Sequence, residues 1–406
     1  MDLHFSTLDN GIRMVHYPVK GVVAYCGIVI NAGSRDEAPD EHGLAHFIEH
    51  MLFKGTNRRK PYHILSYLED AGGELNAYTT KEETAIYATV LREHYKRAVE
   101  IISDILINST FPEKEIEKEK EVVTEEISSY LDNPAELIFD EFDEQVFSHK
   151  PIGRGILGTP DSVRSFTGDA IRKFMARNYD TTRMVFCSVG EISPGEANRL
   201  FTKYFSQLQI NKTMNDRTFD PGYTPVSVVK NQDTNQAHCI TGNIAYNLHD
   251  RRRTVMYLLN NILGGQGLNS RLNMSLREKS GYAYNVESNY HPYVDTGLFS
   301  IYFGTDEKNI SRSFSIARRE MDRLMTSRLG PVQMNRAKNQ VRGYLARSYE
   351  NHEHLMLSMG KSLLVFDKVE PAEAVYRKIE AITSSQILET ANEIFDRAAM
   401  SVLIYK

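Results

Sequence analysis

One order of strands and helices occurs twice along the chain, and this repeat constrains the fold more than any other feature. The first half is expected to contain strands at residues 12–17 and 22–32, helices at 43–53 and 62–71, a strand pair at 75–91, helices at 94–107 and 113–130, and a strand at 182–189. The second half is expected to contain strands at 227–246, a helix at 253–263, strands at 283–304, helices at 310–326 and 332–349, and a closing strand at 400–405.

The repeat indicates duplication of one domain rather than a solenoid, whose repeats span only about 20–50 residues. In both halves the second long helix begins after a proline, Pro112 or Pro331, a residue favoured at helix starts. We predict an α+β fold of two homologous domains, residues 1–208 and 226–406, each a mainly antiparallel sheet covered by helices. Residues 209–225 are polar and without periodicity, and are predicted to be the linker.

Composition excludes several classes of protein. The 406 residues are 41% apolar and 25% charged, with a net charge of -5, so no basic field is available for nucleic acid or anionic lipid. The longest apolar run, residues 21–30, is too short to cross a bilayer. Cys26, Cys187 and Cys239 form no CxxC pair and suit buried thiols in a reducing compartment. We therefore expect a cytoplasmic protein without nucleic-acid or membrane partners.

A candidate metal site begins in the segment 42–55, which we expect to form a short helix ended by a glycine. At helical spacing, four apolar side chains share one side: Leu44, Phe47, Ile48 and Met51. His46, Glu49 and His50 share the opposite side. Two histidines one turn apart can bind one ion, and a carboxylate between them can take a proton from a water at the open position. The H-x-x-E-H spacing is the reverse of the commoner H-E-x-x-H zinc motif.

Two alternatives remain open for this segment. The motif could be a chance coincidence on a surface helix, since the chain has 13 histidines. His42 lies one turn earlier on the same face and is a second-choice ligand, because Gly43 weakens the first turn.

A third ligand is expected from the charged helix after Pro112. Glu119 and Glu126, seven residues apart, fall within its apolar stripe: Ile116, Val122, Val123, Ile127 and Tyr130. A buried carboxylate is costly unless it is paired or holds a metal. The alternatives are a salt bridge to a buried Lys or Arg, or an imperfect stripe on a solvated helix.

The second half of the chain serves as an internal control. When Pro112 is aligned with Pro331, Glu119 falls opposite Lys338 and Glu126 opposite Leu345, and the second half has no H-x-x-E-H. The candidate ligands are thus present together in one half and absent together from the other. This distribution favours a metal site in the first half.

Three segments together resemble the pitrilysin-type inverzincin zinc metallopeptidases, in particular the branch of the mitochondrial processing peptidase β-subunit and its bacterial relatives. These segments are residues 46–56, 73–79 and 117–126. The resemblance runs through the whole chain, including residues 151–158 and 263–267. It implies one zinc ion per chain held by His46, His50 and Glu126, with Glu49 as the catalytic base.

The resemblance also implies further site residues. Glu119 matches a supporting carboxylate, and Asn76, Ala77 and Thr79 match an edge strand that pairs with the substrate backbone. Arg277 and Tyr284 match a pair that reaches the substrate carbonyl near the zinc. Considered without the resemblance, the pair is better interpreted as a helix-end arginine and a strand tyrosine with structural roles. The glycines at 264–267 are interpreted as a tight turn after a helix.

Family members enclose peptides between four homologous domains, so a chain with two resembles half of a clamshell. The resemblance implies a metalloendopeptidase acting on peptides or unfolded polypeptides in a chamber formed by two chains, here a homodimer. Two alternatives are a catalytic subunit that requires a different partner chain and a non-catalytic scaffold subunit.

Overall fold

The computed structural model describes residues 2–213, 217–218, 222–232 and 234–406. These residues form two compact units, each built from three separate stretches of chain. Unit 1 comprises Met1–Ser129, Arg154–Asn215 and Arg347–Pro371, and unit 2 comprises Tyr130–Gly153, Asp216–Ala346 and Ala372–Lys406. The expected linker, residues 209–225, lies partly outside the described residues.

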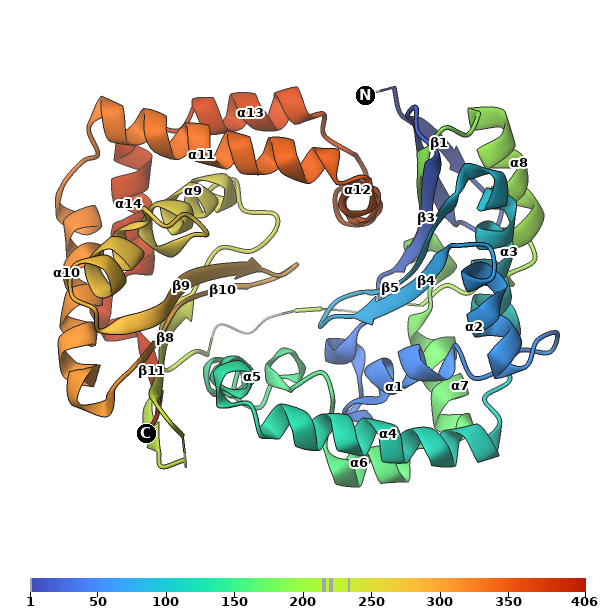
Figure 1. Ribbon diagram of the computed structural model, residues 1–406, viewed down its shortest axis with the longest axis horizontal. Helices are drawn as coiled ribbons and strands as arrows, with labels where there is room; N and C mark the ends of the chain where they lie inside the picture. Colours follow the sequence, from blue (N-terminus) through green and yellow to red (C-terminus); the bar gives the residue numbers. More distant parts are fainter. Residues whose placement is uncertain (1, 214–216, 219–221, 233) are drawn as a thin grey trace. The chain divides into compact units, whose positions relative to one another are not determined.

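Unit 1 is built on a six-stranded sheet in the order β1-β2-β6-β3-β5-β4 (Figure 1). Its strands are β1 (His4–Thr7), β2 (Arg13–Pro18), β3 (Val23–Ile30), β4 (Glu74–Thr79), β5 (Thr84–Leu91) and β6 (Met184–Gly190). Its helices are α1 (Leu44–Met51), α2 (Pro61–Glu69), α3 (Tyr95–Asn108), α4 (Glu113–Leu131, ending in unit 2), α6 (Pro160–Ser165), α7 (Gly168–Asn178), α8 (Pro194–Phe205) and α12 (His352–Phe366). Among the described strands of this sheet, β2 and β6 are the pair that runs in parallel.

Unit 2 is built on a five-stranded sheet in the order β7-β11-β8-β10-β9. Its strands are β7 (Ser227–Lys230), β8 (Ala237–Ile244), β9 (Ala283–Pro292), β10 (Gly297–Thr305) and β11 (Ser401–Tyr405). Its helices are α5 (Pro134–Val146), α9 (Arg253–Gly264), α10 (Ile310–Thr326), α11 (Pro331–Glu350, ending in unit 1), α13 (Ala372–Glu380) and α14 (Ser384–Ile394). The parallel pair among its described strands, β7 with β11, corresponds to β2 with β6. The two sheets therefore match strand for strand once β1 is set aside. The predicted α+β architecture is confirmed.

Each sheet is covered by helices on both faces (Figure 1). In unit 1, Ala24, Cys26 and Ile28 of β3 pack with α1, α3 and α8, whereas Val29 packs with Met356 of α12. In unit 2, Phe299 of β10 packs in the core formed with α9, α10 and α14, whereas Leu298 packs with Ile138 and Phe142 of α5. Strands buried on both faces carry continuous apolar runs, which explains the sequences of β6 and β10.

The helices α5 and α12 were not predicted, and they change the division of the chain. Residues 130–153, which were predicted to lie in the first domain, belong to unit 2. Residues 347–371, which were predicted to lie in the second domain, belong to unit 1. Each half of the chain therefore supplies one helix to the sheet of the other. In the part of the chain that the structure describes, no helix is long and apolar enough to cross a membrane.

Candidate active site

The helix α1 carries three of the predicted site residues and is anchored at both its start and its apolar side. Leu44, Phe47, Ile48 and Met51 have no exposed surface, as the spacing predicted. The carboxylate of Glu37 accepts hydrogen bonds from the backbone N–H groups of Gly43 (3.0 Å) and Ala45 (2.8 Å). These bonds satisfy donors that a helix start leaves free, so Glu37 helps to fix the direction of α1. The sequence pattern gave no indication of this role for Glu37.

The side chains of His46, His50 and Glu126 converge, and each offers one ligand atom within 4.8 Å of the other two. Glu126 Oε1 lies 3.8 Å from Nε2 of His46, and its Oε2 lies 3.6 Å from Nε2 of His50. These distances are too long for direct hydrogen bonds. Ligand atoms about 2 Å from a tetrahedral zinc ion are roughly 3.3 Å apart, so two imidazoles and a carboxylate at this spacing fit zinc.

His46 is suited to bind as a neutral imidazole. It is buried, and its Nδ1 has no hydrogen-bond partner among the described residues. Burial, together with the neighbouring charge of His50, lowers the pKa of His46 to about 4. At neutral pH the ring therefore carries no proton that would compete with a metal ion.

His50 is held by Glu119. Nδ1 of His50 lies 2.8 Å from Oε1 of Glu119, and Oε2 of Glu119 lies 2.6 Å from Nζ of Lys54. Burial alone would lower the pKa of His50, but the hydrogen bond and charge of Glu119 outweigh it and the pKa is raised. Glu119 is 4% exposed, so its carboxylate is buried as expected. It forms the salt bridge to a lysine that was one alternative, and it also contacts a candidate metal ligand.

Glu126 corrects one expectation. The apolar stripe of α4 was expected to bury Glu126 and Val122, but both are exposed. The Glu126 side chain is 43% exposed, and Val122 is 50% exposed. Ile116, Val123 and Ile127 form the buried side of α4. Glu126 lies at the edge of this side, where its carboxylate reaches the two histidines while remaining open to solvent.

Glu49 lies on α1 between the two histidines and is half-buried. Its Oε2 has no hydrogen-bond partner among the described residues. Burial raises the pKa of the Glu49 carboxyl above its usual range. A carboxylate with a free oxygen and a raised pKa is a stronger base than an ordinary carboxylate and is suited to accept a proton from water.

His42 does not join this group. Its Nε2 lies 2.8 Å from the backbone carbonyl of Gly155. The expected helix end also differs in detail, because α1 ends at Met51 and Gly55, with φ of +129°, follows after a short turn.

The strand β4 lies at the edge of the sheet of unit 1 and contains Asn76, Ala77 and Thr79 (Figure 1). It pairs with β5, which leaves its other edge unpaired within the sheet. An unpaired edge offers backbone donors and acceptors to an added peptide strand. The helix α1 packs against β4, so this edge and the histidines belong to one region of unit 1.

Arg277 and Tyr284 lie in unit 2 and lie close to each other. Arg277 belongs to a π-helical turn at Asn273–Glu278, and its Cζ is 5.1 Å from the centre of the Tyr284 ring. Tyr284 is 76% exposed, whereas Tyr282 packs against the core of unit 2, which favours Tyr284 as the partner of Arg277.

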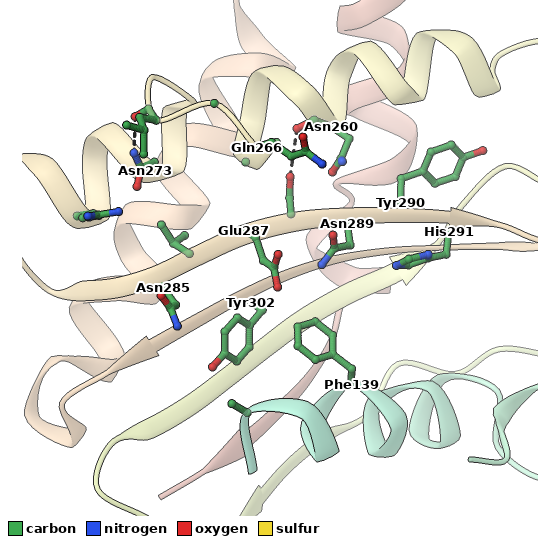
Figure 2. A pocket seen from close by; sticks show the side chains of 18 of the residues that line it. Phe139, Asn260, Gln266, Asn273, Asn285, Glu287, Asn289, Tyr290, His291 and Tyr302 are labelled. Atoms are coloured by element: carbon green, nitrogen blue, oxygen red, sulfur yellow. Dashed lines mark hydrogen bonds between the residues drawn. The ribbon is translucent and has the colours of Figure 1, made fainter. Parts of the chain in front are cut away.

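Arg277 and Tyr284 line a pocket of about 670 Å³ within unit 2. Figure 2 shows Glu287 and Asn289 of β9 facing the pocket, with Phe139 of α5 and Tyr302 of β10 on its lower side. The glycine-rich stretch at 264–267 turns directly after α9, as interpreted, and also lines this pocket. The sequence pattern does not indicate this pocket, because α5 and β9 are far apart in the chain.

Known protein families and individual proteins match this chain over most of its length. Residues 15–160 match the model of insulinase (peptidase family M16), and residues 165–341 match the peptidase M16 inactive domain. A protein of Rickettsia bellii named an uncharacterized zinc protease is 34% identical over 99% of this chain and 97% of its own. The uncharacterized zinc protease YmxG of Bacillus subtilis is 32% identical over 96% of this chain and 95% of its own length. A probable mitochondrial-processing peptidase subunit beta of Arabidopsis thaliana is 28% identical over 97% of this chain and 76% of its own length.

Solved structures share the fold. A protease from Helicobacter pylori has a TM-score of 0.89 at 19% identity, covering 100% of this chain and 99% of its own. A peptidase M16 inactive domain from Pseudomonas fluorescens has a TM-score of 0.91 at 17% identity, covering 100% and 98%. The chain belongs to the M16 family of zinc peptidases, the pitrilysin-type family that its motifs resemble.

Proposed function

We propose that the chain is a zinc metalloendopeptidase whose zinc ligands are His46, His50 and Glu126. The observation that carries the proposal is the convergence of these three side chains within 4.8 Å beside the unpaired oxygen of Glu49. A zinc ion held there would polarise the scissile carbonyl and make an attacking water more acidic. A scaffold role would leave this arrangement without a purpose.

Glu49 acts as the general base in this proposal. Its free oxygen takes a proton from the attacking water and later gives it to the leaving amine. Glu119 does not touch the substrate; its hydrogen bond holds the ring of His50 in place. His46 remains neutral because of its burial, so it needs no proton release before binding the metal.

The proposed substrate is an extended polypeptide. Its backbone pairs with the free edge of β4 at Asn76, Ala77 and Thr79, which gives affinity without strict dependence on sequence. Arg277 and Tyr284 contribute donors for the substrate carbonyl, and the pocket they line is supporting evidence for a role in substrate contact.

The substrate proposal predicts a strong preference for unfolded chains. A peptide must be extended to pair with β4, and a native protein with about 5 kcal/mol of stability exposes such a segment only rarely. We expect disordered casein to be cut faster than a tightly folded protein by a factor of roughly 10³ or more. Product release monitored by mass spectrometry measures this ratio. Equal rates for both substrates would contradict binding at the strand edge.

We further propose that the active form is a homodimer in which two chains enclose the substrate. Light scattering is expected to give about 93 kDa, twice the 46.4 kDa chain. Full activity on long peptides from a monomer would contradict the two-chain chamber. Activity that appears only after a distinct homologous chain is added would favour the heterodimeric alternative. The cytoplasmic location expected from the three unpaired cysteines is part of the same proposal.

A further inference from the structure

We propose that Lys54 is a positioning residue for the metal site. Its ammonium group holds the Glu119 carboxylate in the orientation that fixes His50. The inference rests on the proposed zinc site. Lys54 is not one of the candidate metal ligands, and it acts on His50 through Glu119.

The carboxylate of Glu119 is held at both oxygens. Oε1 lies 2.8 Å from Nδ1 of His50, and Oε2 lies 2.6 Å from the ammonium group of Lys54. The residue is 4% exposed, so water has little room to replace either partner. A buried carboxylate that loses one of its two partners retains an unsatisfied oxygen and is free to rotate. The second contact therefore defines the plane of the carboxylate.

The backbone around Lys54 places its side chain in reach of α4. Its N–H donates to the carbonyl of Met51 at 3.1 Å, which continues the end of α1 by one turn. Gly55 follows with φ of +129°, a conformation that favours glycine, and its carbonyl accepts from the N–H of Thr110 at 3.1 Å. The turn after α1 is thus tied to the segment that leads into α4. Lys54 is only 29% exposed, unlike an ordinary surface lysine.

The orientation of His50 depends on this chain of contacts. When Nδ1–H of His50 donates to Glu119, the lone pair of Nε2 points to the other side of the ring, where Oε2 of Glu126 lies 3.6 Å away. Partners that hold a ligand by its second nitrogen are typically worth 10–100-fold in metal affinity. Lys54 contributes to this support indirectly, because it holds the Glu119 carboxylate that holds His50.

The test uses the full-length chain and measures zinc affinity by competition with a chelator. We expect Lys54→Met to weaken zinc binding by about 10–100-fold. Lys54→Arg is expected to restore most of the loss, since a guanidinium group can also donate to Oε2. Lys118→Met is the matched control, because Lys118 lies on α4, is 57% exposed and pairs with Glu115 at 2.8 Å. It is expected to bind zinc as the wild type does.

A double variant separates positioning from a general loss of folding. Lys54→Met/Glu119→Gln leaves no buried charge unpaired, and its zinc affinity is expected to equal that of Glu119→Gln alone. Additive losses, or wild-type affinity in a folded Lys54→Met, would overturn the role of Lys54. The variant Glu126→Ala distinguishes this failure from that of the zinc site itself. Zinc lost from Glu126→Ala but held normally by Lys54→Met overturns only the present inference.

Discussion

Replacement of Glu49 by glutamine is expected to abolish peptide hydrolysis while zinc stays bound. Glutamine has the same shape but cannot accept and return a proton, and a positioned general base contributes about 10²–10⁴-fold to the rate. The carboxylate belongs to α1 but not to the converging group of ligand atoms, so its loss leaves the metal contacts intact. The measurements are the turnover rate on an unfolded peptide and the zinc content of the purified variant.

Metal content is the control that gives this prediction its meaning. A Glu49→Gln protein with a normal zinc-to-protein ratio and a normal melting temperature attributes the loss of activity to proton transfer. Activity within a few-fold of the wild type would show that another group accepts the proton. Loss of zinc would show that Glu49 is a ligand.

Replacement of Glu126 by alanine is expected to remove zinc. Residues that only support ligands are worth 10–100-fold in affinity, so loss of one of three ligands should cost more than about 10². Zinc analysis after dialysis measures the effect, and hydrolysis should disappear with the metal. Because Glu126 is exposed on α4, the substitution creates no cavity and the fold should persist.

Glu125→Ala is the matched control for this variant. Glu125 is the preceding residue on α4, is also exposed and is about 100° away around the helix. It is expected to retain zinc and activity. Full zinc in Glu126→Ala would mean that the third ligand lies elsewhere, and His42 would then be tested next, although its Nε2 faces the carbonyl of Gly155.

The local pattern of the sequence predicted most of the elements that carry the site. The helix expected at 310–326 is α10 (Ile310–Thr326), and the apolar side of α1 is buried as its spacing predicted. His46, Glu49 and His50 could be grouped because residues three and four apart share one side of a helix whatever the rest of the fold does.

Tertiary structure decided what local spacing could not express. The sequence contains the apolar residues of α5 and α12, but nothing local indicates that each covers a sheet built mainly from the other half of the chain, because such a contact joins residues that are far apart in the sequence. Glu126 was expected to be buried and is exposed, since burial depends on which elements cover a helix as well as on its periodicity. Lys54 and Glu37 acquire their roles from partners on other segments. Sequence alone thus determined the chemistry of the candidate ligands and the order of the duplicated elements. The packing of distant segments determined which side chain holds each ligand and how both sheets are closed, because buried charge and apolar surface must be satisfied in three dimensions.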